Sequence, residues 1–156
     1  MKILDKLPYR EEATLLSYHS GAIDIRPYQI VVWVRLQRLV FPAVLDTGFS
    51  GSFALTNQQL ESLGGITSLE QIGAIEVNRI VQPVFESEVW IHHNRPGTRE
   101  PTEQATQLTI DDGIIVSSEG GTRIPILGMK AITWSQLKLA IDGERRQVTL
   151  KTKEWL

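Results

Sequence analysis

A single carboxylate stands where an apolar run meets a turn rich in glycine. Asp46 follows FPAVL at 41–45 and opens the segment DTGFSG, in which two glycines fall within six residues. Strands are apolar because they pack, and burial of an unpaired charge is costly, so an acid here is unusual. Two such acids that share one proton hydrolyse a peptide bond, because the ionised acid activates water and the protonated one donates to the carbonyl oxygen. The competing interpretation is a surface β-turn in which Asp46 caps its own loop.

The segment FPAVLDTGFSGSFAL at 41–55 resembles the first catalytic strand and loop of the retropepsin-like aspartic proteases, above all their prokaryotic single-domain branch. Roughly 80 residues later, Ile126-Leu127-Gly128 resembles the second hallmark of that family, two apolar residues and a glycine before a short helix. The resemblance covers about residues 28 to 151. It implies a mostly β, closed β-barrel-like fold with two short helices. We expect a single domain over 1–156, in which the mixed and polar residues 1–22 form an N-terminal arm or an irregular first strand.

The same resemblance implies a role for each residue of the loop. Asp46 is the catalytic acid, and Thr47 sends its hydroxyl across to a second subunit. Gly48 lets the backbone approach the substrate without a Cβ clash. Phe49 contacts the substrate, and Ser50 hydrogen-bonds the outer oxygen of Asp46.

Two further segments acquire roles from the resemblance. Ile126, Leu127 and Gly128 pass behind the loop and support it, without a catalytic part. The turn Val77-Asn78-Arg79 takes the place of the flap that closes over substrate. Retroviral flaps are rich in glycine, whereas this turn has none. That departure, with the polar stretch 93–105, favours an alternative function: a retropepsin-like binding or dimerisation module without turnover.

The chain contains only one Asp-Thr-Gly triplet. The turns at 111–113 and 142–143 lack the apolar strand that precedes a catalytic acid and the Thr or Ser that follows it. Neither turn therefore supplies a second catalytic acid. A twofold homodimer does supply it, because symmetry places Asp46 opposite its own copy. The expected partners are therefore a second copy and a polypeptide substrate, and no metal or organic cofactor is expected.

Composition narrows the alternatives further. With 42% apolar residues the chain has enough for one core, and the absence of cysteine excludes disulfides, thiolate catalysis and thiolate-bound metals. A formal net charge of -2 provides no general attraction to nucleic acid or anionic membranes. No stretch approaches the roughly 18 apolar residues of a membrane span, and charges interrupt the first residues. We expect a soluble cytoplasmic hydrolase.

The elements that must position Asp46 follow from periodicity. Thr56, with Gln59 three residues later, predicts the capped start of a helix within 55–63, and Gly64-Gly65 predicts its end. A second helix is predicted after Gly128. The stretch 93–105 contains two prolines and several charges and predicts a solvated loop. Alternation and β-branched residues predict strands at 28–36, 41–45, 72–77, 80–85, 88–92, 107–110, 114–117 and 147–151.

Other groups of residues have simpler interpretations. His92 and His93 are adjacent, so on a strand they point to opposite faces, which favours a solvated strand end over a metal site. Glu86 and Glu88 share one face, as a glycosidase pair would, but solvent exposure is the expected state. The four tryptophans are irregularly spaced and are expected as core or dimer contacts: Trp33, Trp90, Trp134 and Trp155.

Overall fold

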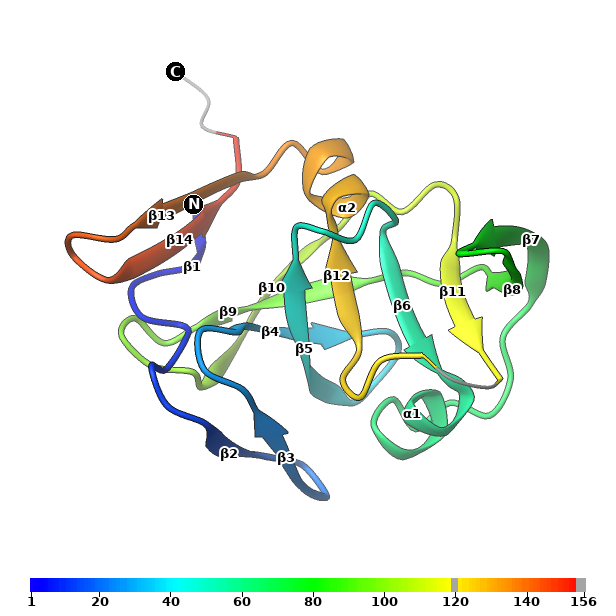
Figure 1. The fold of residues 1–156 in the computed structure, drawn as a ribbon, viewed down its shortest axis with the longest axis horizontal. Helices are drawn as coiled ribbons and strands as arrows, with labels where there is room; N and C mark the ends of the chain where they lie inside the picture. Colours follow the sequence, from blue (N-terminus) through cyan, green and yellow to red (C-terminus); the bar gives the residue numbers. More distant parts are fainter. Residues whose placement is uncertain (119–120, 154–156) are drawn as a thin grey trace.

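The computed structural model describes residues 1–118 and 121–153, and it is mostly β with two short helices, α1 (Asn57–Ser62) and α2 (Met129–Trp134) (Figure 1). This confirms the predicted fold class. Neither helix has the length and apolar character needed to span a membrane. The strands are β1 (Lys2–Leu4), β2 (Thr14–Tyr18), β3 (Gly21–Ile25), β4 (Ile30–Arg35), β5 (Val40–Asp46), β6 (Phe53–Thr56), β7 (Gln71–Val77), β8 (Ile80–Phe85), β9 (Trp90–Asn94), β10 (Pro101–Gln107), β11 (Ile114–Ser117), β12 (Ile126–Gly128), β13 (Lys138–Asp142) and β14 (Gln147–Lys151).

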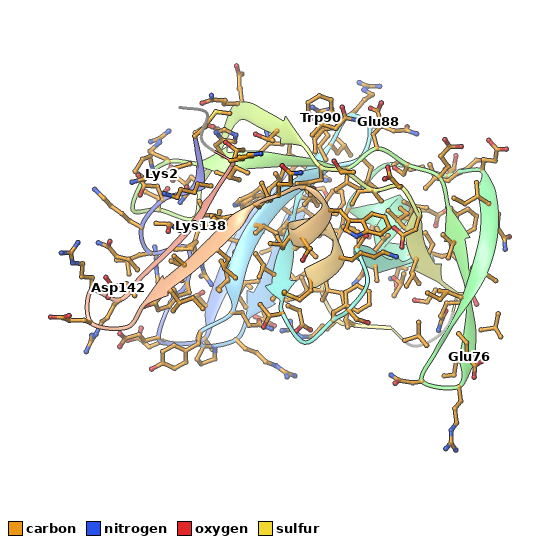
Figure 2. The ribbon with its side chains drawn as sticks, turned by 90° about the horizontal axis from the view of Figure 1, so that it is seen from above. Lys2, Glu76, Glu88, Trp90, Lys138 and Asp142 are labelled. Carbon is orange, nitrogen blue, oxygen red and sulfur yellow. The ribbon has the colours of Figure 1, made fainter. Side chains whose placement is uncertain are left out.

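The largest sheet has nine strands in the order β10-β9-β4-β5-β12-β6-β11-β8-β7. Its centre has an unusual arrangement, because β12 is inserted between β5 and β6, parallel to the first and antiparallel to the second. The chain passes directly from β5 to β6 through residues 47–52, so β12 lies against the loop that joins its two neighbours. A short three-stranded sheet, β1-β14-β13, and the β2–β3 hairpin complete the fold. The β7–β8 and β13–β14 hairpins lie at opposite ends of the molecule (Figures 1 and 2).

Burial explains why the central strands are apolar at almost every position. The strands β4 and β5 pack one face on the main core, where Phe41, Phe53 and Leu127 have no exposed surface. Their other face packs under the β2–β3 hairpin in a second cluster that includes Trp33 and Val44. Strands covered on both faces lose the alternation of a half-exposed strand. Asp46 therefore follows a segment that is buried from both sides.

The predicted hairpin of β4 and β5 and the predicted helix cap are confirmed. The two strands pair antiparallel, with Arg35 opposite Val40. Thr56 accepts a hydrogen bond from the Gln59 backbone, and the Gln59 side chain bonds back to the Thr56 backbone, which is a complete capping box. Gly65 follows the helix with φ of 66°, the left-handed conformation that glycine adopts at little cost.

The prediction of a solvated loop at 93–105 is wrong. Strand β9 continues to Asn94, and β10 begins at Pro101 and pairs back on it, with Ala105 opposite His92. Proline is tolerated because Pro101 opens a strand at the edge of the sheet, where its missing N–H breaks no ladder. The strand predicted at 107–110 is misplaced for the same reason, since β10 ends at Gln107.

His92 and His93 are buried, which corrects the prediction of a solvated strand end. Strand β10 covers them: a His92 ring nitrogen bonds the Thr102 carbonyl at 2.9 Å, and a His93 ring nitrogen bonds the Thr106 hydroxyl at 2.8 Å. Burial lowers the pKa of His93, and the neighbouring His92 lowers it further. Both rings therefore serve as polar members of the interior.

The N-terminal residues take part in the core. Strand β1 pairs with β14, and Ile3 and Leu4 have no exposed surface. Of the tryptophans, Trp33 is buried and donates its indole N–H to the Arg99 carbonyl, while Trp134 is partly exposed on α2. Trp155 lies outside the described residues. Glu86 and Glu88 are exposed, as expected, in the irregular segment between β8 and β9.

Candidate active site

Asp46 is the last residue of β5 and is half-buried. Its Oδ1 accepts a hydrogen bond from the Gly48 backbone N–H at 2.9 Å, and its carbonyl accepts from the Phe49 N–H at 3.2 Å. These two bonds close a tight turn, so the backbone just after the strand orients the carboxylate. Gly48 is crowded by the same arrangement, because a Cβ there would lie 3.2 Å from Oδ1.

The two motifs that lie far apart in the sequence meet here. Gly128 at the end of β12 and the first two residues of α2 donate three backbone hydrogen bonds to the loop: Gly128 to the Ser52 carbonyl at 2.8 Å, Met129 to the Phe49 carbonyl at 2.9 Å and Lys130 to the Gly51 carbonyl at 3.2 Å. In the parallel pairing of β12 with β5, Gly128 is the residue opposite Asp46. The loop after Asp46 is thus bonded from behind along most of its length.

Gly128 is the closest point of this contact. A Cβ built on it would lie 2.2 Å from the Gly51 carbonyl oxygen and 2.7 Å from that of Phe49, distances that no side chain tolerates. The preceding residues extend the support into the core, since Leu127 is fully buried and Ile126 pairs with both Val44 and Ala54. The absence of a side chain at 128 is what allows the helix and the loop to touch.

The outer face of the loop is open. Thr47 and Ser50 are exposed, and among the described residues neither hydroxyl makes a hydrogen bond, including the bond to Asp46 that the sequence suggests for Ser50. Met129, which follows the loop's support strand, is also 39% exposed. The loop and the adjoining start of α2 therefore present unbonded hydroxyl groups and an apolar side chain to solvent.

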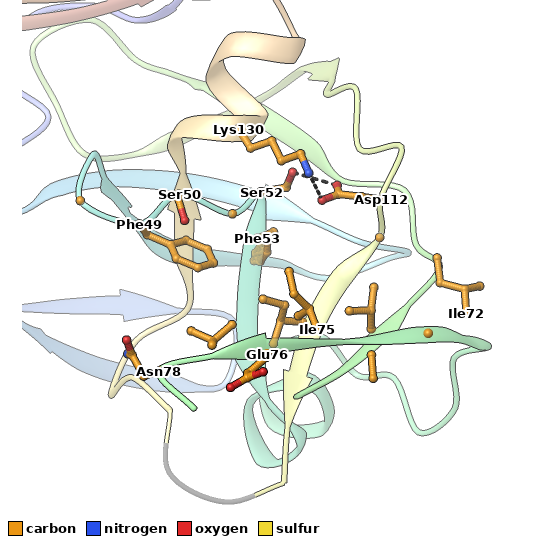
Figure 3. A pocket seen from close by; sticks show the side chains of 18 residues that line it. Phe49, Ser50, Ser52, Phe53, Ile72, Ile75, Glu76, Asn78, Asp112 and Lys130 are labelled. Carbon is orange, nitrogen blue, oxygen red and sulfur yellow. Dashed lines mark hydrogen bonds and ion pairs between the residues drawn. The ribbon is translucent and has the colours of Figure 1, made fainter. Parts of the chain in front are cut away.

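A groove of about 720 Å³ lies between this loop and the β7–β8 hairpin (Figure 3). The loop contributes residues 48–53, and the hairpin contributes residues 72–78. Of the residues predicted to contact substrate, Phe49, Val77 and Asn78 line the groove, whereas Arg79 lies outside its lining; contact with a substrate stays a prediction. Asp46 stands at the start of the loop that forms one wall, two residues before the lining begins.

The β7–β8 hairpin projects from the body of the protein. Every residue of β7 before Val77 is exposed, and Ile80 and Val81 on β8 are 60% and 69% exposed. Its turn consists of Asn78 and Arg79 alone, with φ of 52° and 66°. Positive φ at both central residues is the conformation of a type I′ turn, for which Asn-Gly is the preferred sequence.

We expect Arg79→Gly to raise the free energy of unfolding by about 0.5–1 kcal/mol, because glycine adopts positive φ without the steric cost of a side chain. Urea denaturation of the variant measures this gain, with Arg95→Gly on an exposed loop as the comparison. Because Arg79 does not border the groove, ligand or substrate affinity should stay unchanged. A loss of stability would contradict the turn geometry.

Sequence reasoning missed an ion pair at one end of the groove. Lys130 Nζ lies 2.6 Å from Asp112 Oδ2, and the Ser52 hydroxyl donates to Asp112 Oδ1 at 3.2 Å (Figure 3). Lys130 Nζ also lies 4.4 Å from the ring centre of Trp134. The Asp111-Asp112-Gly113 turn was recognisable in the sequence, but nothing local indicated that α2 brings a lysine to it.

The described residues contain no group of three His, Cys, Asp or Glu side chains able to hold a metal ion. Both ring nitrogens of His92 already have partners, because Arg35 Nε donates to Nε2 at 3.2 Å and Nδ1 bonds the Thr102 carbonyl. The chemistry available around Asp46 is that of carboxylate, hydroxyl and backbone groups.

Comparison with known proteins found no family model and no curated protein sequence that matches this chain. Among solved structures, the chain is similar to a retropepsin-like aspartic protease from Rickettsia conorii, with 16% sequence identity and a TM-score of 0.44. The alignment covers 88% of this chain and 89% of that protein.

Proposed function

We propose that this protein is an aspartic endopeptidase that acts as a homodimer, with Asp46 of each copy forming the acid pair. The observation that carries the proposal is the setting of Asp46. Its carboxylate ends a fully packed strand, is oriented by the Gly48 N–H, and opens a loop that β12 supports through Gly128. The loop forms one wall of a groove large enough for a peptide segment.

Dimerisation follows from the chemistry. One carboxylate either activates water or donates a proton, and hydrolysis needs both actions at once. Among the described residues, two other acids line the groove: Asp112, which is already paired with Lys130 and Ser52, and Glu76, which belongs to β7 on the opposite wall from the loop. The exposed Thr47, Ser50 and Met129 surround the Asp46 turn and supply a surface on which a second copy can dock.

The reaction then needs one water and one shared proton. The ionised Asp46 removes a proton from the water while the water oxygen bonds the carbonyl carbon of the substrate. At the same time the protonated Asp46 of the other copy gives its proton to the carbonyl oxygen. When the tetrahedral diol collapses, one of its hydroxyls gives its proton to the ionised acid of the pair, the C–N bond breaks, and the amine nitrogen takes the proton of the other acid. The pair returns to its starting state with one proton shared.

The groove favours a peptide with an apolar side chain. Ile72, Ile75 and Val84 line it, and the Lys130–Asp112 pair closes one end with little net charge. The exposed strand β7 lies at the edge of the large sheet, and its free backbone groups suit an extended peptide that adds as a further strand.

Solution mass at micromolar concentration tests the dimer directly. We expect twice the chain mass of 17.6 kDa, measured by light scattering. Cleavage of a diverse peptide library from about pH 3 to pH 8 tests the hydrolysis. A strict monomer contradicts the proposed acid pair. A dimer that cleaves no peptide in the library instead supports the alternative of a binding module without turnover.

A further inference from the structure

A second pocket, of about 540 Å³, is lined by residues of β2 and of the turn between β9 and β10, and Figure 1 shows these elements on the side of the molecule away from the β7–β8 hairpin. Strand β2, strand β4 and the turn between β9 and β10 form it. Thr14, Trp33 and Thr98 line it, together with two arginines, Arg10 and Arg99. None of its lining residues borders the groove beside Asp46. This pocket is therefore distinct from the groove in which we propose peptide hydrolysis.

Arg99 is buried in a way that is rare for a guanidinium group. The residue is 7% exposed, and its Nη1 donates to the Thr14 hydroxyl. Its backbone is held as well, because the Trp33 indole N–H donates to the Arg99 carbonyl. Nε and Nη2, in contrast, have neither a hydrogen-bond partner nor solvent contact. Buried donors without partners are exceptional in native proteins and call for an explanation.

No carboxylate of the described residues is paired with Arg99. Its chain neighbour Glu100 lies 3.4 Å from Arg95, and Glu11 pairs with Arg146 at 3.0 Å. The charge that acts on Arg99 is that of another cation, Arg10, which lines the same pocket. Burial, and then Arg10, lower the pKa of Arg99 to about 10, so the group remains positive at neutral pH. Two guanidinium groups and one carboxylate, that of Glu100, line the pocket, so an excess of positive charge remains there.

The two unpartnered nitrogens are the pair that a guanidinium uses for side-on recognition. Nε–H and one Nη2–H point in parallel, and an anion with two oxygens bonds both at once. Thr14 occupies Nη1 and so fixes the orientation of that fork. We propose that this pocket binds a small oxyanion, a phosphate or a carboxylate group, across Nε and Nη2 of Arg99, with Arg10 as the second cation.

Nε and Nη2 of Arg99 have no solvent contact, so an anion reaches them only when side chains that line the pocket move. Arg10 is exposed at the pocket, and its Nη1 is held by the carbonyls of Leu7 at 3.4 Å and Tyr9 at 3.1 Å. These bonds are long or on the surface, so the side chain turns at little cost. An incoming anion attracts the Arg10 guanidinium toward Arg99 and relieves the repulsion between the two.

Thermal unfolding of the whole protein tests the site, with sodium phosphate or sodium acetate replacing sodium chloride at constant ionic strength. We expect phosphate, acetate or both to raise Tm saturably above the chloride value. A response to phosphate alone identifies a phosphate site, and a response to acetate identifies a carboxylate site. If Tm follows ionic strength alone with both anions, the proposal is wrong.

Three variants localise the effect. Arg99→Met should abolish the anion-dependent rise in Tm, and Arg10→Gln should weaken the apparent affinity roughly two- to fivefold. Arg95→Gln removes the same charge from an exposed position on the same turn and should respond as the wild type does. If Arg99→Met does not fold, Arg10→Gln decides the question, because an unchanged affinity in that variant would overturn the site. Peptide cleavage is not measured, so failure here leaves the proposed hydrolysis standing.

Discussion

Asp46→Asn lowers kcat/KM for peptide cleavage by at least about 10³-fold, the expected loss when a group that transfers protons is removed. Asparagine has the same shape and keeps an oxygen for the Gly48 N–H, so the turn stays closed. It neither carries the negative charge that activates water nor shares a proton with its copy. Cleavage of a peptide selected from the library measures the loss.

Two controls separate chemistry from folding. Asp142→Asn changes an exposed carboxylate on the last residue of β13, at the end of the molecule opposite the β7–β8 hairpin, and should retain full activity (Figure 2). Mixing wild type with an excess of Asp46→Asn should reduce activity further than dilution does, because each mixed dimer has a single acid. Substantial peptide cleavage by the pure Asp46→Asn dimer would contradict the assignment of Asp46 as the catalytic acid.

Gly128→Ala destabilises the fold by about 3 kcal/mol, near the upper end for a methyl group forced into a packed region. The added Cβ would meet the Gly51 carbonyl 2.2 Å away and the Phe49 ring 2.6 Å away. Because the Gly51 carbonyl is a backbone group, the backbone of the loop after Asp46 must shift to make room for the methyl group. Urea denaturation measures the stability, and the same cleavage assay measures the accompanying loss of activity.

Gly143→Ala is the matched control, because its Cβ meets nothing within 4 Å. It should change the free energy of unfolding by less than about 0.5 kcal/mol. If Gly128→Ala were as stable as the wild type, β12 would not be packed tightly against the loop. That result would contradict the structural role that we assign to β12 in holding the Asp46 turn.

Local signals made part of this fold predictable. The bounds predicted for 80–85, 114–117 and 147–151 are those of β8, β11 and β14, because each segment has the β-branched residues of a strand between clear turns. The capping box at Thr56 and Gln59 needs only residues three apart, so its prediction was equally local. Resemblance of two short motifs also pointed to the two segments that the structure brings together.

Errors came from contacts between distant residues. The composition of 93–105 is that of a loop, and it forms β10 because β9 offers a free edge for pairing. That pairing then buries His92 and His93, which nothing in their own neighbourhood indicated. The Lys130–Asp112 pair spans the join between α2 and the turn before β11, and it was missed for the same reason.

The sequence by itself determined which carboxylate stands at the end of an apolar strand and which helix is capped, since each depends on residue types within a few positions. The glycine behind that carboxylate was indicated only by the resemblance of residues 126–128 to a family motif. Only the tertiary structure decided that β12 enters between β5 and β6, that a projecting hairpin forms the second wall of the groove, and that Arg99 is buried without a counter-ion. The physical reason is that burial and strand pairing depend on contacts between segments that are far apart in the sequence, and local residue patterns do not specify which segments come into contact.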